Sequence, residues 1–106
     1  MAKLKRMKNI LVMKTGEALV GQVLDAEFEI KSAFGLLTFK PKQIVHIHFA
    51  GAPGFPVDEL QIVSGDRIKG DVSPRKLLFK LESTGQEVEI PKSTIHTAVF
   101  LDSISG

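Results

Sequence analysis

The chain contains no cysteine, no tryptophan and no tyrosine among its 106 residues. Without cysteine, it can form neither disulfide bonds nor thiolate metal sites, and it has no cysteine nucleophile. Its longest apolar run is residues 10–13 (ILVM), far short of the roughly 20 residues that a membrane-spanning helix needs. The N-terminus is basic, but it lacks the apolar stretch and the small-residue cleavage site of a secretory signal. We therefore expect a cytoplasmic protein with no membrane partner.

Positive charge is concentrated at the N-terminus. The formal net charge is +2, and residues 1–8 contain four basic and no acidic residues: Lys3, Lys5, Arg6 and Lys8. Residues 9–50 are neutral overall, and residues 57–102 carry a net charge of −2. A basic segment attracts phosphates. Any prediction of nucleic-acid binding from overall charge therefore rests on this short tail.

Two stretches of the chain repeat one pattern. Residues 15–23 read TGEALVGQV and residues 64–72 read SGDRIKGDV, which is a spacing of 49. Aligning Gly16 and Gly21 with Gly65 and Gly70 brings Val23 opposite Val72, and the similarity continues to Phe49 and Phe100 once two extra residues are allowed in the second half. A repeat of about 50 residues predicts an internal duplication.

Short alternating segments predict an all-β protein. Runs of four to seven residues, such as EFEIK at 27–31, alternate apolar and charged side chains and are separated by glycine-containing turns. The expected organisation is a basic tail or short helix (1–8), a first β-barrel repeat (9–50), a Gly/Pro linker (51–56), a second β-barrel repeat (57–102) and a C-terminal tail (103–106). We expect the two repeats to pack as one pseudo-twofold unit. The sequence leaves open whether each repeat closes its own barrel or the two exchange strands.

The second glycine of each repeat lies inside a strand pattern. Glycine at such a position marks a sharp bend, a bulge or a close approach of another backbone. We therefore interpret Gly21 and Gly70 as architectural, and not as part of a loop that binds phosphate.

The segment TGEALVGQVLDAE (15–27) resembles the first conserved segment of the Sm and Sm-like proteins, in which a turn with Gly and an acidic residue precedes a bent strand. SGDRIKGDV (64–72) carries part of the same pattern. The resemblance implies an SH3-like five-stranded barrel behind a short N-terminal helix, assembly edge to edge into rings, and RNA binding. The family's RNA-contacting residues are not matched here: AEFEIKS (26–32) lacks the family's Asn, and neither half contains its Arg-Gly run.

Three histidines form a candidate metal site. His46 and His48 lie on one face of a predicted strand, and His96 lies in the matching strand of the second half. A His-x-His pair can bind zinc when a third ligand converges on it. The alternative is that the histidines line a partly hydrated sheet face.

The sequence predicts no enzyme and no cofactor. No serine has the context of a nucleophile, and the acidic residues of the predicted strands alternate with apolar ones as on a solvated face.

Two hypotheses about function follow. In the first, the protein is a structural or interaction module that forms a homo-oligomer, ring-like in the Sm manner, through its β-strand edges. In the second, it binds RNA or single-stranded nucleic acid through Phe34 at a hairpin tip, the basic tail, and the lysines Lys31, Lys40 and Lys42. Of the other phenylalanines, Phe55 lies in the linker, and five occupy strand positions expected in the core: Phe28, Phe39, Phe49, Phe79 and Phe100.

Overall fold

All secondary structure in the described part of the chain is β-strand, apart from two single-turn 3₁₀ helices. The computed structural model describes residues 8–51, 54 and 56–101. The first half contains β1 (Lys8–Met13), β2 (Ala18–Val23), β3 (Phe28–Ser32), β4 (Gly35–Phe39), η1 (Pro41–Gln43) and β5 (Ile44–His48). The second half contains β6 (Asp58–Ile62), β7 (Arg67–Ser73), β8 (Lys76–Leu81), β9 (Glu87–Pro91), η2 (Lys92–Thr94) and β10 (Ile95–Leu101). The all-β prediction is confirmed, and the predicted N-terminal helix lies outside the described residues.

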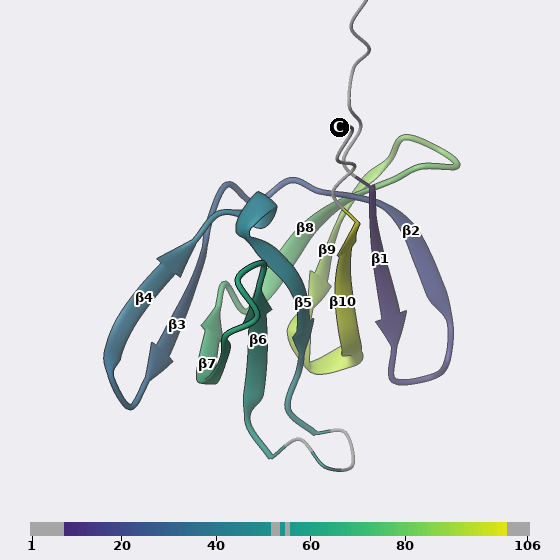
Figure 1. The fold of residues 1–106 in the computed structure, drawn as a ribbon. Coiled ribbons are helices and arrows are strands. Elements are labelled where there is room, and N and C mark those ends of the chain that lie inside the picture. The colour runs from purple at the N-terminus through teal and green to yellow at the C-terminus, as the bar shows by residue number, and fades with distance from the viewer. Residues whose placement is uncertain (1–7, 52–53, 55, 102–106) are drawn as a thin grey trace, which may run out of the picture.

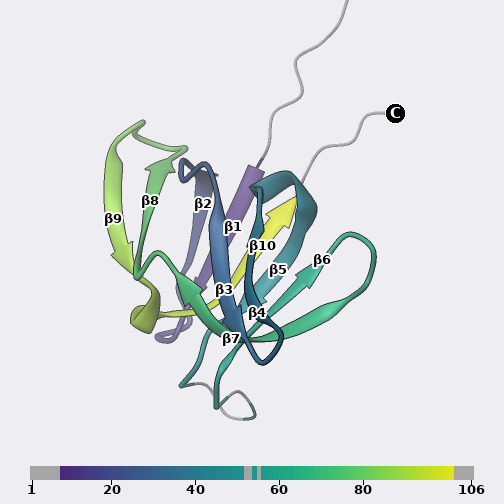
Figure 2. The same ribbon diagram turned by 90° about the vertical axis from the view of Figure 1, so that its left-hand side faces the viewer.

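The ten strands form one antiparallel sheet in the order β4-β3-β7-β6-β5-β10-β1-β2-β8-β9. The sheet is strongly curled, with β8 and β9 on one side of the molecule and β5 and β6 on the other (Figures 1 and 2). We call the strands β4, β3, β7, β6 and β5 the β4 lobe, and the strands β10, β1, β2, β8 and β9 the β9 lobe. The pair β5–β10 joins the two lobes.

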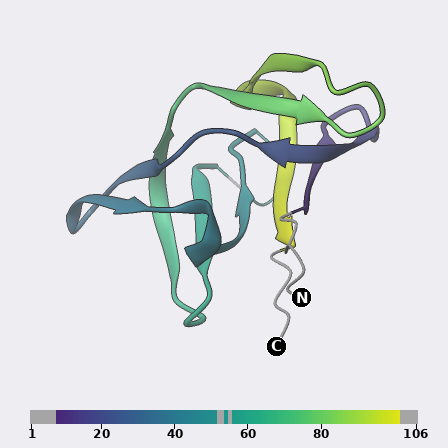
Figure 3. The same ribbon diagram turned by 90° about the horizontal axis from the view of Figure 1, so that it is seen from above.

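Each lobe contains strands from both halves of the sequence. β3 of the first half pairs with β7 of the second, and β2 of the first half pairs with β8 of the second. The segment from β2 to β3 therefore runs across the whole molecule, as the view from above shows (Figure 3). The halves exchange strands within one continuous sheet, and two tandem barrels are not confirmed.

The strand order is symmetric with respect to the two halves. Suppose that each strand of the first half is exchanged with its counterpart in the second half, β1 with β6, β2 with β7 and so on to β5 with β10. The order of strands in the sheet is then the same order read from the other end. The point about which the order reverses lies between β5 and β10, the last strand of each half.

Gly21 and Gly70 lie where strands of opposite halves meet. Gly21 pairs with Leu81 of β8, and Gly70 pairs with Ser32 of β3. A Cβ atom on Gly21 would overlap the carbonyl oxygen of Lys80, and one on Gly70 would overlap that of Lys31. The structure therefore confirms the close backbone approach among the alternatives that the sequence offered for these glycines.

The segment between β2 and β3 is held to β8 by a backbone hydrogen bond and by one carboxylate. The N–H of Leu24 donates to the carbonyl of Leu78 at 2.8 Å, and the N–H of Leu78 donates to Asp25 Oδ2 at 2.9 Å. Burial raises the pKa of Asp25, although its hydrogen bonds to backbone N–H groups act in the opposite direction. Asp25 thus fixes the passage from β2 to β3 against β8.

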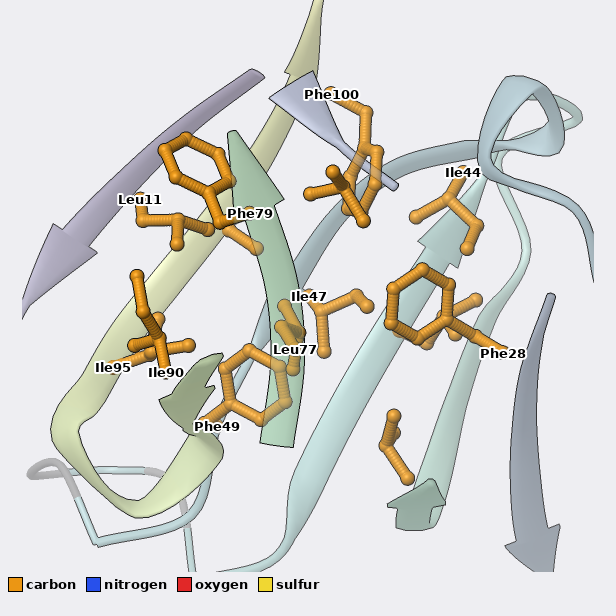
Figure 4. Packing of buried hydrophobic residues seen from close by; sticks show 14 of the residues in the cluster. Leu11, Phe28, Ile44, Ile47, Phe49, Leu77, Phe79, Ile90, Ile95 and Phe100 are labelled. Carbon is orange, nitrogen blue, oxygen red and sulfur yellow. The ribbon is translucent and has the colours of Figure 1, made fainter. Parts of the chain in front are cut away.

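Apolar side chains from both halves form one core (Figure 4). The rings of Phe28 and Phe100 meet edge to face, with centroids 5.8 Å apart and an interplanar angle of 80°. Of the phenylalanines expected in the core, Phe28, Phe49, Phe79 and Phe100 are buried and Phe39 is partly buried. The two lobes share this core. Strands of the first half are therefore buried against strands of the second half.

Candidate functional site

The hairpin between β3 and β4 presents two exposed large apolar side chains, including the most exposed one among the described residues, Phe34. Phe34 at its tip is 87% exposed and Leu36 on β4 is 63% exposed. Ser32 Oγ holds the tip by accepting from the N–H of Phe34 at 3.0 Å and donating to the carbonyl of Gly35 at 2.9 Å. The hairpin projects from one end of the sheet (Figure 1). The expected exposure of Phe34 is confirmed, whereas Phe55 lies outside the described residues.

The two edges of the sheet differ in character. β4 pairs only with β3, and its sequence, GLLTF, contains no charged residue. β9 pairs only with β8, and its sequence, EVEIP, contains Glu87, Glu89 and Pro91. Charged residues and proline on an edge strand oppose pairing with another chain. The edge at β9 is therefore protected, and the edge at β4 is not.

The structure does not gather the predicted nucleic-acid-binding residues on one surface. Lys31 is on β3, close to Phe34 in the same hairpin, whereas Lys40 and Lys42 follow the opposite end of β4. Lys8 begins β1, and its ammonium lies 3.8 Å from the Glu82 carboxylate in an exposed ion pair. Three further predicted residues lie outside the described residues: Lys3, Lys5 and Arg6.

The three histidines lie together on the adjacent strands β5 and β10. The rings of His46 and His48 are 4.4 Å apart between centroids. Nδ1 of His48 lies 3.0 Å from Thr97 Oγ1, and Nδ1 of His96 lies 2.7 Å from the same hydroxyl. Thr97 therefore links His48 to His96 where β5 of the β4 lobe pairs with β10 of the β9 lobe.

The charge state of two of these histidines is shifted towards neutral. Burial lowers the pKa of His46, and nearby Arg67 acts in the same direction, against Glu59. Burial also lowers the pKa of His48, followed by the charge of His46. No group of three or more His, Cys, Asp or Glu side chains that could hold a metal ion occurs among the described residues.

A buried ionic network lies at the junction between the lobes, and sequence reasoning did not identify it. Asp58, the first residue of β6, is 2% exposed. Its Oδ1 accepts from the N–H of Ala50 at 2.7 Å, and its Oδ2 accepts from the N–H of Val72 at 2.9 Å. The Lys92 ammonium donates to the same Oδ2 at 2.8 Å. One carboxylate of β6 thus connects the segment that follows β5 with β7 and η2.

Lys92 uses its remaining protons within the same network. Its Nζ donates to Asp71 Oδ1 at 2.7 Å and to the carbonyl of Val72 at 2.7 Å. Burial lowers the pKa of Lys92, but hydrogen bonds and charge from Asp58 and Asp71 outweigh burial, so the pKa is raised. The hydrogen bond from Lys92 lowers the pKa of Asp71. The ammonium is therefore held charged and has all three N–H donors in use.

The network forms part of the wall of a pocket of about 630 Å³. The pocket draws on both lobes, and its charged lining consists of Asp58, Asp71, Arg75, Lys76 and Lys92. Phe49, Pro56, Val57 and Pro91 contribute to its apolar lining. The volume lies within the range of small-molecule sites, roughly 300 to 1,000 Å³.

The sequence does hold a signal for Asp58. Along β6 the inward positions are Asp58, Leu60 and Ile62, and along β1 the aligned positions are Asn9, Leu11 and Met13. Asn9 is 2% exposed, and its Oδ1 accepts from the N–H of Val23 at 2.7 Å. A polar residue at an inward strand position in both halves is therefore the feature that could have identified this network.

The chain matches no known protein-family model, no curated protein and no solved structure. The resemblance to the Sm family therefore stays a prediction. No helix among the described residues is long and apolar enough to cross a membrane.

Proposed function

We propose that the protein is a non-enzymatic structural or interaction module that associates with further copies of itself through the edge at β4. The observation that carries this proposal is the contrast between the two edges of the sheet. β9 carries the charges and the proline that oppose pairing, and β4 carries none of them. An unprotected edge strand offers its free backbone N–H and C=O groups to another strand.

The sequence of β4 suits pairing with a second β4. Antiparallel pairing about Leu37 places Leu36 of one copy opposite Thr38 of the other and Phe34 opposite Lys40. No like charges then face each other, and the lysine stem can cover the aromatic ring. This two-fold contact is self-complementary and closes a dimer. Protection of β9 favours this dimer over a ring built by joining β4 to β9.

The symmetric strand order also supports a proposed origin of the chain as a tandem duplication of an Sm-like unit. In this proposal the halves of a duplicated chain occupy equivalent places in one sheet because each half supplies the strands that the other lacks. We also propose a cytoplasmic location, with which the lack of cysteine is consistent.

Self-association can be tested by sedimentation equilibrium over a wide range of concentration. We expect a reversible dimer, and we expect Leu36→Lys to weaken it by at least about tenfold, because two buried charges would then lie in the paired edge. Val63→Lys is the matched control, since Val63 is 66% exposed and Leu36 is 63% exposed. A strict monomer at the highest concentration, or equal effects of the two substitutions, would contradict the proposal.

A second candidate function is binding of single-stranded nucleic acid, favoured by the exposed Phe34 ring with Lys31 on the same hairpin. Stacking of a base on this ring would contribute about 1 to 3 kcal/mol. Because the chain has no tryptophan or tyrosine, co-purified nucleic acid would dominate its ultraviolet spectrum. A clean spectrum, with no binding of a labelled oligonucleotide at low salt, would exclude this candidate.

A further inference from the structure

The pocket at the junction between the lobes is lined by charged residues at positions where the first half of the chain has other residues. In the first half, Asn9 occupies the position aligned with Asp58 and makes the equivalent hydrogen bond, to the N–H of Val23 instead of Val72. A neutral side chain therefore satisfies the architectural requirement at this position. The second half uses a carboxylate, which has to be compensated by Lys92 once it is buried.

The other charged residues of the pocket are equally specific to the second half. The positions aligned with Asp71, Arg75, Lys76 and Lys92 are, in that order, Gln22, Ala26, Glu27 and Pro41. Both halves form the same strands and pair in equivalent ways. Since equivalent strands form in the first half without these residues, their presence together around one pocket points to a role in addition to their structural one.

Two of the three cations in the pocket are available to a ligand. Lys92 is saturated by Asp58, Asp71 and the carbonyl of Val72. Arg75 and Lys76 are exposed, and within the described ranges neither side chain forms a hydrogen bond or an ion pair.

The balance of charge also favours an anion. The lining holds three basic and two acidic residues, which gives it a net charge of +1. Lys92 holds Asp58 and one oxygen of Asp71, so these two carboxylates are partly neutralised. Arg75 acts on Asp71 through its charge without bonding to it. The side-chain N–H donors of Arg75 and Lys76 are thus left for an occupant of opposite sign.

We propose that this pocket is a binding site for a small organic anion with an apolar body. The anionic group would lie between Arg75 and Lys76, and the apolar body would pack against Val57 and Pro91. Sites of this kind combine an apolar lining with a few polar groups that fix the orientation of the ligand. The proposal is independent of self-association, because none of these residues belongs to β4.

The test uses the full chain and the fluorescent probe 8-anilinonaphthalene-1-sulfonate, which combines an anionic group with an apolar ring system. The absence of tryptophan and tyrosine leaves the probe as the dominant source of signal. We expect saturable binding that octanoate displaces, whereas octanol, with the same chain and no charge, displaces the probe at least about tenfold less well.

Two double variants with the same change in charge distinguish the pocket from the rest of the surface. Arg75→Gln with Lys76→Gln should raise the dissociation constant of the probe at least about tenfold. Arg67→Gln with Lys69→Gln, on β7 and outside the pocket lining, should change it less than twofold. All four side chains are exposed, so both variants should retain the melting temperature of the parent within a few degrees.

Three results would overturn the proposal. They are binding that does not saturate, equal displacement by octanol and octanoate, and equal effects of the two double variants. Binding of the probe at the exposed Phe34 hairpin would give the last of these results, since neither pair of substitutions touches that hairpin.

Discussion

Asp58 and Asn9 occupy aligned buried positions, and their side chains differ in one atom, an oxygen in Asp58 and a nitrogen in Asn9. This difference changes the partners that each side chain needs. Both side chains accept a hydrogen bond from a backbone N–H of the neighbouring strand. The second oxygen of Asp58 accepts from Ala50, whereas the corresponding Nδ2 of Asn9 has no hydrogen-bond partner within the described residues. The carboxylate satisfies more of the backbone, but it needs a cation beside it in the interior.

Asp58→Asn should therefore destabilise the protein by about 3 kcal/mol, because it leaves Lys92 partly unpaired in a buried site. Asp71→Asn removes the other carboxylate of Lys92, but the Asp71 side chain is 64% exposed, so the expected loss is about 1 kcal/mol or less. Urea denaturation of both variants gives the comparison. Equal losses would show that burial of Asp58 does not set the strength of the network.

Gly21→Ala and Gly70→Ala should each reduce the free energy of unfolding by about 2 kcal/mol or more. The added Cβ overlaps the backbone of a strand from the opposite half, and a backbone carbonyl cannot move aside as a flexible side chain can. Gln22→Ala, an exposed neighbour on β2, should change stability by about 0.5 kcal/mol or less. Wild-type stability in either glycine variant would show that the strands are not held this closely.

At the scale of elements, most of the local structure could be predicted from the sequence. The alternation of EFEIK and the glycine turns locate the strands, because one face of each strand has to be apolar. The partners of the strands could not be predicted. The two halves carry similar patterns, so β3 satisfies the same burial next to β2 of its own half as next to β7 of the other half. The hydrophobic pattern of the sequence therefore does not distinguish strand pairing within one half from strand pairing between the halves.

The same reasoning explains which parts of the site could be found. Phe34 was identifiable because its place in a short glycine turn leaves an apolar side chain without a core to enter. Lys92 was not, because its partners Asp58 and Asp71 are 34 and 21 residues away in the chain. η2 lies between β9 and β10 in the chain, and the fold brings it against β6 and β7 of the β4 lobe.

The histidines on β5, where this strand pairs with β10, should make the stability of the protein depend on pH. The pKa values of His46 and His48 are lower in the folded protein than their ordinary value of about 6.5. The unfolded chain therefore binds more protons below that pH, and stability falls as the pH falls through about 6.5 towards the lower folded values. Asp71, whose folded pKa is also lowered, loses its contribution only below about 4, outside this range.

We expect a lower melting temperature at pH 5 than at pH 7.5, measured by circular dichroism. In the double variant His46→Gln, His48→Gln this difference should largely disappear. A difference of the same size in the variant would assign the pH dependence to other groups.

At the scale of the whole molecule, the exchange of strands makes each half depend on the other. Neither half contains a complete lobe, since the β4 lobe takes β6 and β7 from the second half and the β9 lobe takes β1 and β2 from the first. Each half has about 50 residues, which is near the lower limit for a stable core. The two halves therefore constitute a single cooperative unit.

Cleavage within the linker gives a direct test of this dependence. Peptides covering residues 1–51 and 57–106 should each be largely unfolded alone and should regain β structure when mixed in equal amounts, because every exchanged pair can re-form between them. Circular dichroism and hydrogen exchange report the change. A cooperative unfolding transition in either isolated monomeric peptide would show that the halves are independent.

The pairing of β1 with β10 bears on the order in which the protein can form during synthesis. Lys8 lies opposite Leu101 in this pair, so the first and last described strands are neighbours near the middle of the sheet. β1 is the first of the described strands to be translated, but β10, which covers one of its sides, is the last of them. Until residues 95–101 have emerged, an apolar strand edge stays uncovered on the nascent chain. Completion of the sheet therefore waits for residues 95–101, and until then the uncovered edge of β1 is open to wrong pairing.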